Sequence, residues 1–215
     1  MSCQFDLAHY RELLEAAKAG GYRWAGFERP PTPGDLLLRH DVDLSLTAAV
    51  ELAEVEAELG AWSTWFLMTR SVFYNLASPE GERAIARLRE LGGRIAHHAV
   101  WPHVDLDESF GSEPAVAWHN PEPDYMNEAI GGATNVMTAP WFVPDNYRSD
   151  SNQHWRNGCP HEPLARGEFE WLQLLIHPEI WVYEGRTMRE TMRSFLDADR
   201  EARLEHLRAD RIDLE

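Results

Sequence analysis

Hydrophobic positions along this chain change repeatedly from the spacing of helices to that of short strands. Apolar residues recur at helical spacing over residues 6–18, 44–59 and 80–91, and glycine follows each of these segments. Short runs of strand-favouring residues cover 36–43, 62–68 and 94–98. In the second helical segment, Glu51, Glu54, Glu56 and Glu58 lie mostly opposite the apolar stripe, which predicts a solvated helix face. The alternation predicts an α/β fold with a parallel sheet, in which sites gather at the carboxyl ends of strands.

The second half of the chain is less regular. Prolines interrupt residues 100–167, although the apolar pieces 115–118 and 133–138 can form further strands. Loop-rich regions of this length inside a compact domain are more often functional than idle. Residues 170–178 read as a buried strand that ends at His177, and the charged segment 186–208 predicts a terminal helix. At 215 residues, the chain is expected to form one domain over residues 1–215.

Composition narrows the classes of partner. The net charge is −16 at pH 7, which disfavours nucleic acid and anionic lipid because the surface would repel them. The first residues lack the pattern of a secretory signal and no later apolar run can span a bilayer, so we expect a cytoplasmic protein without membrane insertion. Cys3 and Cys159 are too few for a disulfide framework and are expected to be free thiols. Nothing in the sequence indicates an oligomeric state.

One apolar run ends in two carboxylates. Residues 36–43 read Leu-Leu-Leu-Arg-His-Asp-Val-Asp, and side chains two apart on a strand share a face, so Asp41 and Asp43 can converge on one site. The alternative is an Asp-rich turn in which Asp43 or Ser45 caps the following helix. The remaining reactive residues distinguish these two interpretations.

Histidines follow two other strand ends. His97 and His98 close one predicted strand, with His103 just beyond, and His177 closes the late one. A divalent metal ion needs about three protein ligands and an open position, and one carboxylate with two imidazoles suits a borderline metal such as zinc. A second carboxylate could then take a proton from bound water, and a separate histidine could protonate a leaving group.

Together these segments resemble the NodB-type polysaccharide deacetylase family, in its branch with an Arg-His-Asp-Val-Asp first motif. The segments that carry the resemblance are 38–43, 63–67, 71–76, 91–98, 149–156 and 172–178, in the family's order. The resemblance implies a distorted (β/α) barrel. It also implies metal-dependent hydrolysis of an N-acyl amide, usually an N-acetyl group on an amino sugar.

The resemblance assigns individual roles. Asp41 matches the general base, Asp43 the carboxylate metal ligand, His98 the first histidine ligand and His177 the general acid. In a looser match, Asp150 and Trp155 lie where the family places pocket residues and residues that support the catalytic groups.

The second and third motifs depart from the family pattern. Family members commonly place their histidine ligands four residues apart, but Pro102 stands four after His98, and His103 stands five after it. Either a bulge at Pro102 returns His103 to the metal, or His97 and His98 contribute differently, or the site is impaired. The third-motif arginine is absent, and the nearest candidate is His119.

The sequence therefore predicts a metal-dependent deacetylase acting on an amino sugar or a sugar-containing intracellular metabolite. Asp43, His98 and His103 are expected to hold one divalent ion, zinc first and cobalt or nickel otherwise. Residues expected to contact the substrate or support the site are His40, His97, His119, Asp150 and Trp155. Two alternatives stay open: the same machinery acting on a non-sugar amide or formamide, and a metal-free glycan-binding or regulatory protein.

Overall fold

The computed structural model describes residues 3–100, 110, 112–124, 126–128 and 132–212. The strands are β1 (Arg23–Trp24), β2 (Asp35–Val42), β3 (Thr64–Leu67), β4 (Arg94–Ala99), β5 (Ala115–Trp118), β6 (Thr134–Asn135), β7 (Tyr147–Ser149) and β8 (Leu172–Ile176). The α-helices are α1 (Leu7–Ala19), α2 (Leu46–Glu58), α3 (Pro79–Glu90), α4 (His161–Ala165), α5 (Pro178–Val182) and α6 (Met188–Ala209). Two 3₁₀ turns, η2 (Pro144–Asn146) and η3 (Ser151–Gln153), flank β7.

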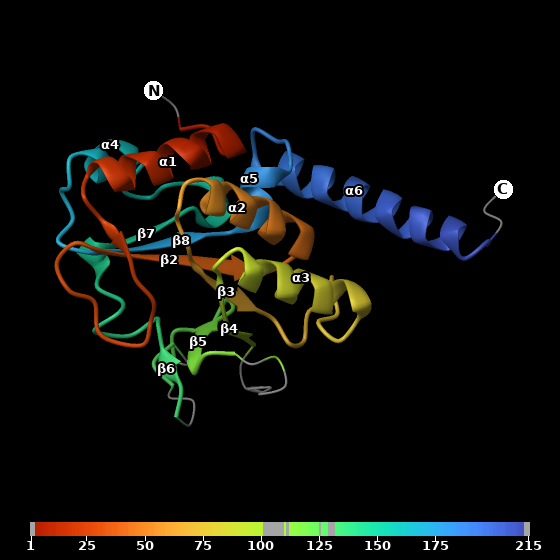
Figure 1. The fold of residues 1–215 in the computed structure, drawn as a ribbon, viewed down its shortest axis with the longest axis horizontal. Helices are drawn as coiled ribbons and strands as arrows, with labels where there is room; N and C mark the ends of the chain where they lie inside the picture. Colours follow the sequence, from red (N-terminus) through yellow and green to blue (C-terminus); the bar gives the residue numbers. More distant parts are fainter. Residues whose placement is uncertain (1–2, 101–109, 111, 125, 129–131, 213–215) are drawn as a thin grey trace.

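All strand pairs in the described sheet are parallel. The order is β6-β5-β4-β3-β2-β8-β7. The short strand β1 is additionally paired with the first two residues of β2, Asp35 and Leu36. The terminal strands β6 and β7 do not pair with each other in the described part of the chain, so the curled sheet is an open half-barrel (Figure 1). The predicted α/β fold with a parallel sheet is confirmed.

Alternate residues of β2 enter two different cores. Leu36 and Leu38 join the cluster formed with α1, α2 and α5 on the helix-covered face. Leu37 joins a second cluster on the other face, with Phe66 and Ala96 among its members. Every residue of β2 is buried, as expected for a strand covered on both faces. This parity decides which side chains can reach the site.

Side-chain caps begin the predicted helices. Asp6 accepts from the His9 backbone N–H at the start of α1, and Ser45 accepts from Ala48 at the start of α2. Because Ser45 is the cap of α2, Asp43 is not used for that purpose. The solvated face predicted for α2 is wrong at Glu56, which is only 2% exposed.

Sequence periodicity misses the short elements. β7, α4 and α5 contain three to five residues each, too few to produce a recognisable period. The segment expected as a terminal helix forms α6, which extends beyond the sheet in Figure 1. Among the residues described, no helix has both the length and the apolar character needed to cross a bilayer.

Candidate active site

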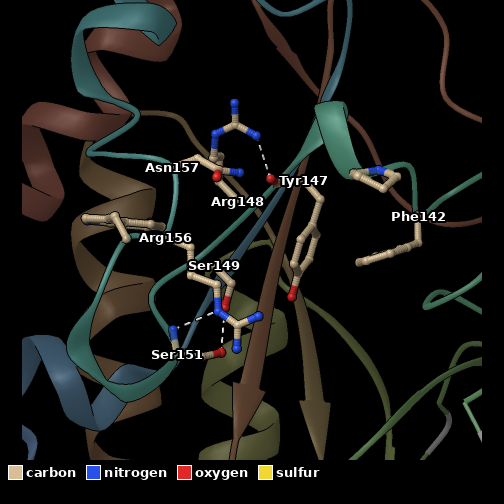
Figure 2. A pocket seen from close by; sticks show the side chains of 9 residues that line it. Phe142, Tyr147, Arg148, Ser149, Ser151, Arg156 and Asn157 are labelled. Atoms are coloured by element: carbon tan, nitrogen blue, oxygen red, sulfur yellow. Dashed lines mark hydrogen bonds between the residues drawn. The ribbon is translucent and has the colours of Figure 1, made fainter. Parts of the chain in front are cut away.

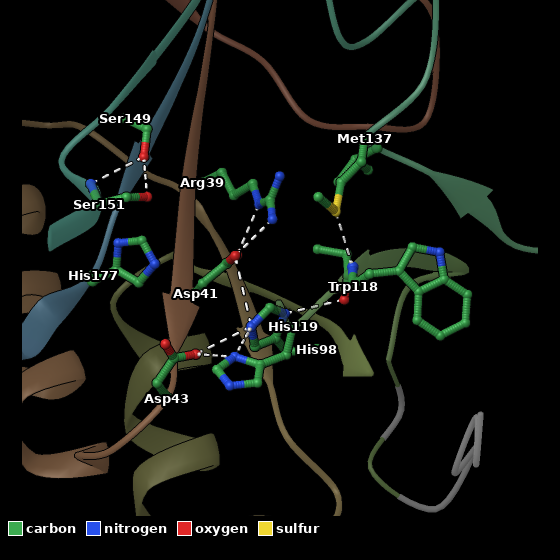
Figure 3. Close-up of polar contacts among 12 residues, drawn as sticks. Arg39, Asp41, Asp43, His98, Trp118, His119, Met137, Ser149, Ser151 and His177 are labelled. Carbon is green, nitrogen blue, oxygen red and sulfur yellow. Dashed lines mark hydrogen bonds and ion pairs between the residues drawn. The ribbon is translucent and has the colours of Figure 1, made fainter. Parts of the chain in front are cut away.

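Polar side chains converge at the carboxyl ends of five strands. Asp41 and Asp43 come from the end of β2, and His98 from that of β4. The other three follow their strands directly: His119 after β5, Asp150 after β7 and His177 after β8. Because the strands are parallel, these ends lie at one edge of the sheet (Figure 3).

Asp43, His98 and His119 form a compact triangle of possible ligand atoms. Asp43 Oδ1 lies 3.1 Å from His98 Nε2 and 3.1 Å from His119 Nδ1. The two imidazole nitrogens are also 3.1 Å apart. Ligand atoms about 2.0–2.1 Å from a tetrahedral zinc ion lie about 3.3–3.4 Å from one another. The residues therefore fit a divalent metal ion with little movement.

Hydrogen bonds orient one of these imidazoles for metal binding. His98 Nδ1 lies 3.0 Å from the Ala117 carbonyl oxygen, an acceptor, so Nδ1 carries the proton and Nε2 presents a lone pair to the triangle. His119 is half-buried, and its hydrogen bond with Asp43 raises its pKa. Burial alone would raise the pKa of Asp43, but its hydrogen bonds with His119 and His98 hold it below its usual range. A metal ion would have to displace the proton on His119.

Asp41 is held by a bidentate ion pair from its own strand. Arg39 donates from Nε to Oδ1 at 2.7 Å and from Nη2 to Oδ2 at 2.6 Å. Gln173 Oε1 accepts from Arg39 Nη1 at 3.1 Å, which fixes the guanidinium from β8. Burial opposes ionisation of Asp41, but the charges of Arg39 and nearby histidines lower its pKa. Asp41 Oδ2 is 3.7 Å from His98 Nε2, so an ionised carboxylate lies beside the triangle.

His177 is paired with a buried carboxylate. Its Nδ1 is 2.6 Å from Asp150 Oδ1, and its backbone N–H donates to Asp150 Oδ2 at 2.9 Å. Trp181 Nε1 also donates to Asp150 Oδ2, at 2.7 Å. Burial alone would lower the pKa of His177, but the charge and hydrogen bond of Asp150 raise it to about 10. The imidazole is therefore cationic at neutral pH, with Nε2 turned away from Asp150.

Two residues that the sequence analysis did not single out also support the site. Tyr74 donates to the Val42 carbonyl oxygen at 2.6 Å and accepts from the Met68 N–H at 2.8 Å, which ties together the ends of β2 and β3. Glu179, two residues after His177, is 2% exposed, and burial raises its pKa to about 8. An acid two residues after the predicted catalytic histidine was a signal for Glu179, and Tyr74 lies in the segment 71–76 that carries part of the family resemblance.

The structure does not bring every predicted residue to this edge. His103 lies outside the described residues, and the second imidazole of the triangle, beside Asp43 and His98, is His119. His40 is on the other face of β2, where its ring stacks on Trp65 with centroids 3.9 Å apart. His40 thus lies in the helix-covered core and not among the side chains of the triangle. His97 is buried and alternates with His98 along β4, so it too is directed away from the triangle.

Trp155 lies near the site but not in the triangle. It is 6% exposed and stacks on Phe5, with ring centroids 5.9 Å apart. It also lines a pocket of about 270 Å³ beside β7, together with Tyr147 and Arg156 (Figure 2). The pocket residue implied by the resemblance thus borders a cavity on the β7 side of the sheet.

Comparisons with known proteins do not assign a function to this chain. No protein-family model matches the chain, and a search of curated proteins finds no significant match. Among solved structures, the chain is similar to the Bdellovibrio bacteriovorus peptidoglycan deacetylase Bd3279, with 15% sequence identity and a TM-score of 0.37. The match covers 86% of this chain and 54% of Bd3279, so the chain spans about half the length of that protein. At this TM-score, the similarity carries no functional argument.

Proposed function

We propose that this chain is a metal-dependent hydrolase that removes an N-acyl group, most simply N-acetyl, from an amino sugar. One observation carries the proposal: three ligand atoms 3.1 Å apart lie at the same strand ends as a buried carboxylate and a cationic imidazole. In Figure 3, Asp41 and Asp43 stand between His177 on one side and His98 with His119 on the other. The ordered motifs that resemble NodB-type deacetylases support the same reaction class.

The proton-transfer groups suit amide hydrolysis. A divalent ion at Asp43, His98 and His119 would polarise the acyl carbonyl and make bound water more acidic. Asp41 is ionised, so it can accept a proton, and Arg39 fixes its orientation. His177 can donate a proton from Nε2 to the departing amine nitrogen, while Asp150 stabilises its cationic form. A proton acceptor and a proton donor near the ligands are what an acyl transfer from nitrogen to water requires.

The identities of the substrate and the metal follow from chemistry rather than from a bound ligand. The pocket beside β7 offers Tyr147 and Trp155, the kind of aromatic wall that sugars favour. Zinc is the metal we propose, since one carboxylate and two imidazoles suit it, and cobalt or nickel could replace it. The substrate is a small amino-sugar metabolite or glycan, and the acyl group that is removed from its nitrogen is acetyl.

Metal analysis combined with amine release tests the proposal. Protein purified without chelator should contain about one equivalent more zinc or related metal than Asp43→Asn purified in the same way, and a chelator should abolish turnover. N-acetyl amino sugars should release amine faster than simple acetamides or formamides. A difference of less than about a tenth of an equivalent, with no activity after addition of zinc, cobalt or nickel, would favour a metal-free binding protein instead.

A pair of variants, with a control, tests which histidine is the third ligand beside Asp43 and His98. His119→Ala should weaken metal binding by more than about tenfold, because loss of a supporting partner alone costs about 10–100-fold. His103→Ala is the direct rival, and His154→Ala, at an exposed position, is the matched control. Normal metal affinity in His119→Ala together with loss in His103→Ala would contradict the ligand set proposed here.

A further inference from the structure

A second cluster of cysteine and histidine side chains lies between the start of α1 and the start of α4. It consists of Cys3 before α1, His9 on α1 and Cys159 just before α4. The three ligand atoms all lie within 4.8 Å of one another, and His9 Nε2 is 3.2 Å from Cys159 Sγ. Two cysteines 156 positions apart in the chain are thus brought to the same imidazole nitrogen.

The ligand atoms are oriented by neighbouring side chains. Glu12 Oε2 lies 2.8 Å from His9 Nδ1, so the carboxylate holds the proton on Nδ1 and leaves the lone pair of Nε2 facing Cys159. Trp155 donates from Nε1 to Cys3 Sγ at 3.1 Å. A carboxylate behind a histidine is the usual support of a histidine ligand. This arrangement goes beyond what two unrelated buried thiols would need.

The spacing suits a soft or borderline metal. With bonds of about 2.3 Å to sulfur and 2.0 Å to nitrogen, ligand atoms around a tetrahedral zinc ion lie about 3.5–3.8 Å apart. The separation of His9 Nε2 and Cys159 Sγ, 3.2 Å, is slightly shorter than that range, and no pair of ligand atoms is more than 4.8 Å apart. A groove of about 760 Å³ opens beside the cluster, and Asp6 and His161 among its lining residues can supply a fourth ligand. The His161 ring is 5.7 Å from that of His9.

We propose that Cys3, His9 and Cys159 form a second metal site, for a thiophilic divalent cation such as zinc. Two sulfur ligands distinguish it from the Asp43–His98–His119 triangle, which offers only oxygen and nitrogen. The bound ion ties the segment before α1 to the loop before α4. His9 also stacks on Trp181, with centroids 6.2 Å apart, and Trp181 donates to Asp150. The site thus lies directly behind the carboxylate that holds His177, yet its existence does not depend on the proposed reaction.

Cobalt titration of the full, reduced chain tests this site. Sulfur ligands give cobalt a thiolate charge-transfer band in the near ultraviolet, which an oxygen and nitrogen site cannot produce. We expect the band to saturate at about one equivalent of cobalt per chain for this site. Asp43→Asn should leave the band unchanged, whereas Cys159→Ser and Cys3→Ser should each shift and weaken it strongly. His9→Ala should likewise shift and weaken the band. Its matched control is His206→Ala, at an exposed histidine, which should leave the band unchanged.

Alkylation of the unmodified protein provides a second measurement that requires no variant to fold. Zinc should slow the reaction of both cysteines with iodoacetamide at least about tenfold, because a metal-bound thiolate is a poor nucleophile, whereas magnesium should not. The proposal is overturned if reduced protein shows no thiolate band, or if the band has unchanged position and intensity in both serine variants. It is also overturned if zinc protects neither cysteine.

Discussion

Two buried imidazole–carboxylate pairs in this protein have the same contact distance and different surroundings. His40 Nε2 lies 2.6 Å from Glu56 Oε1, and His177 Nδ1 lies 2.6 Å from Asp150 Oδ1. The His40 side chain is fully buried, and Glu56 also accepts hydrogen bonds from Tyr10 and Ser63. The His177 side chain keeps 15% of its surface exposed. The contact itself therefore does not identify a catalytic histidine.

Position on the sheet explains the difference. His40 lies within β2 and points to the helix-covered face, whereas His177 follows the last residue of β8 at the edge where Asp41, Asp43 and His98 end. A histidine inside the strand is sealed by packing, and one beyond the strand end can meet a substrate. If this is correct, substitutions in the His177–Asp150 pair should lower kcat per folded molecule. Substitutions in the His40–Glu56 pair should lower stability but not kcat.

Removal of the acid should have the largest effect on catalysis. His177→Gln should lower kcat by about 10²–10⁴-fold, the usual contribution of a general acid, because glutamine cannot donate a proton to the leaving amine. Stability should fall as well, because Asp150 keeps its hydrogen bonds from Trp181 and from the backbone N–H of residue 177 but loses its cationic partner, so kcat is compared per folded molecule. Turnover and chemical denaturation measure the two effects, and His154→Gln is the matched control at an exposed site.

The same result decides between acid and structural roles for His177. A loss of activity that merely follows a loss of folded protein, with kcat per folded molecule unchanged, would assign His177 to structure. Metal content should stay at the wild-type value in His177→Gln, since this residue is not among the proposed ligands.

The opposite outcome is expected for His40. His40→Ala should lower the free energy of unfolding by about 3–5 kcal/mol, because it leaves Glu56 buried without its imidazole partner. The folded fraction should retain nearly normal kcat, measured below the melting transition. A kcat that falls at least tenfold in fully folded His40→Ala would show that the helix-covered pair also acts in catalysis.

Asp150→Asn should change the pH dependence of activity. The proton on His177 is present below its pKa, so wild-type activity limited by this acid falls only as pH approaches about 10. Without the charge of Asp150, burial lowers that pKa, and the alkaline limb of kcat/KM moves to lower pH. At neutral pH we expect a loss of about 10–100-fold. An alkaline limb that stays in place would exclude His177 as the titrating acid, and Asp145→Asn at an exposed position is the control.

The raised pKa of His177 also predicts how the free energy of unfolding varies with pH. A histidine with a raised pKa in the folded state stabilises it fully below the unfolded value of 6.5, and this contribution is lost as pH rises towards about 10. Denaturation of metal-free wild type should show this loss, and Asp150→Asn should reduce it.

Sequence reasoning reached the strand ends because they depend on local order. Leu36 to Leu38 form a buried run, and the polar residues that follow must lie where the run ends, so Asp41, Asp43, His98 and His177 could be placed. The same alternation that pairs Asp41 with Asp43 also puts His40 on the opposite face. That contrast was available from the sequence and needed no structure.

His119 could not be placed in the same way. Its approach to His98 depends on the pairing of β4 with β5, two strands separated by a long connection whose path no local pattern fixes. Motif spacing instead directed attention to His103. Glu56 was misassigned for a related reason: three hydrogen-bonding partners from other elements, Tyr10, His40 and Ser63, bury a residue that helical periodicity places on a polar face.

The smallest effect should come from Glu179, the buried acid next to His177. Its pKa of about 8 lies above the ordinary 4.5, so the folded state keeps a proton that the unfolded state releases between these values. Stability must therefore fall as pH rises through this window, by at most about 1.4 kcal/mol per pH unit for one proton. Glu179→Gln, which imitates the neutral acid, should remove that slope and leave kcat near pH 6 almost unchanged. Denaturation at several pH values between 5 and 6.5, below the range in which His177 contributes, measures the slope, and Glu184→Gln is the control. An unchanged slope would mean that Glu179 is ionised in the folded protein. Asp150 and Glu179 would then both carry a negative charge near His177.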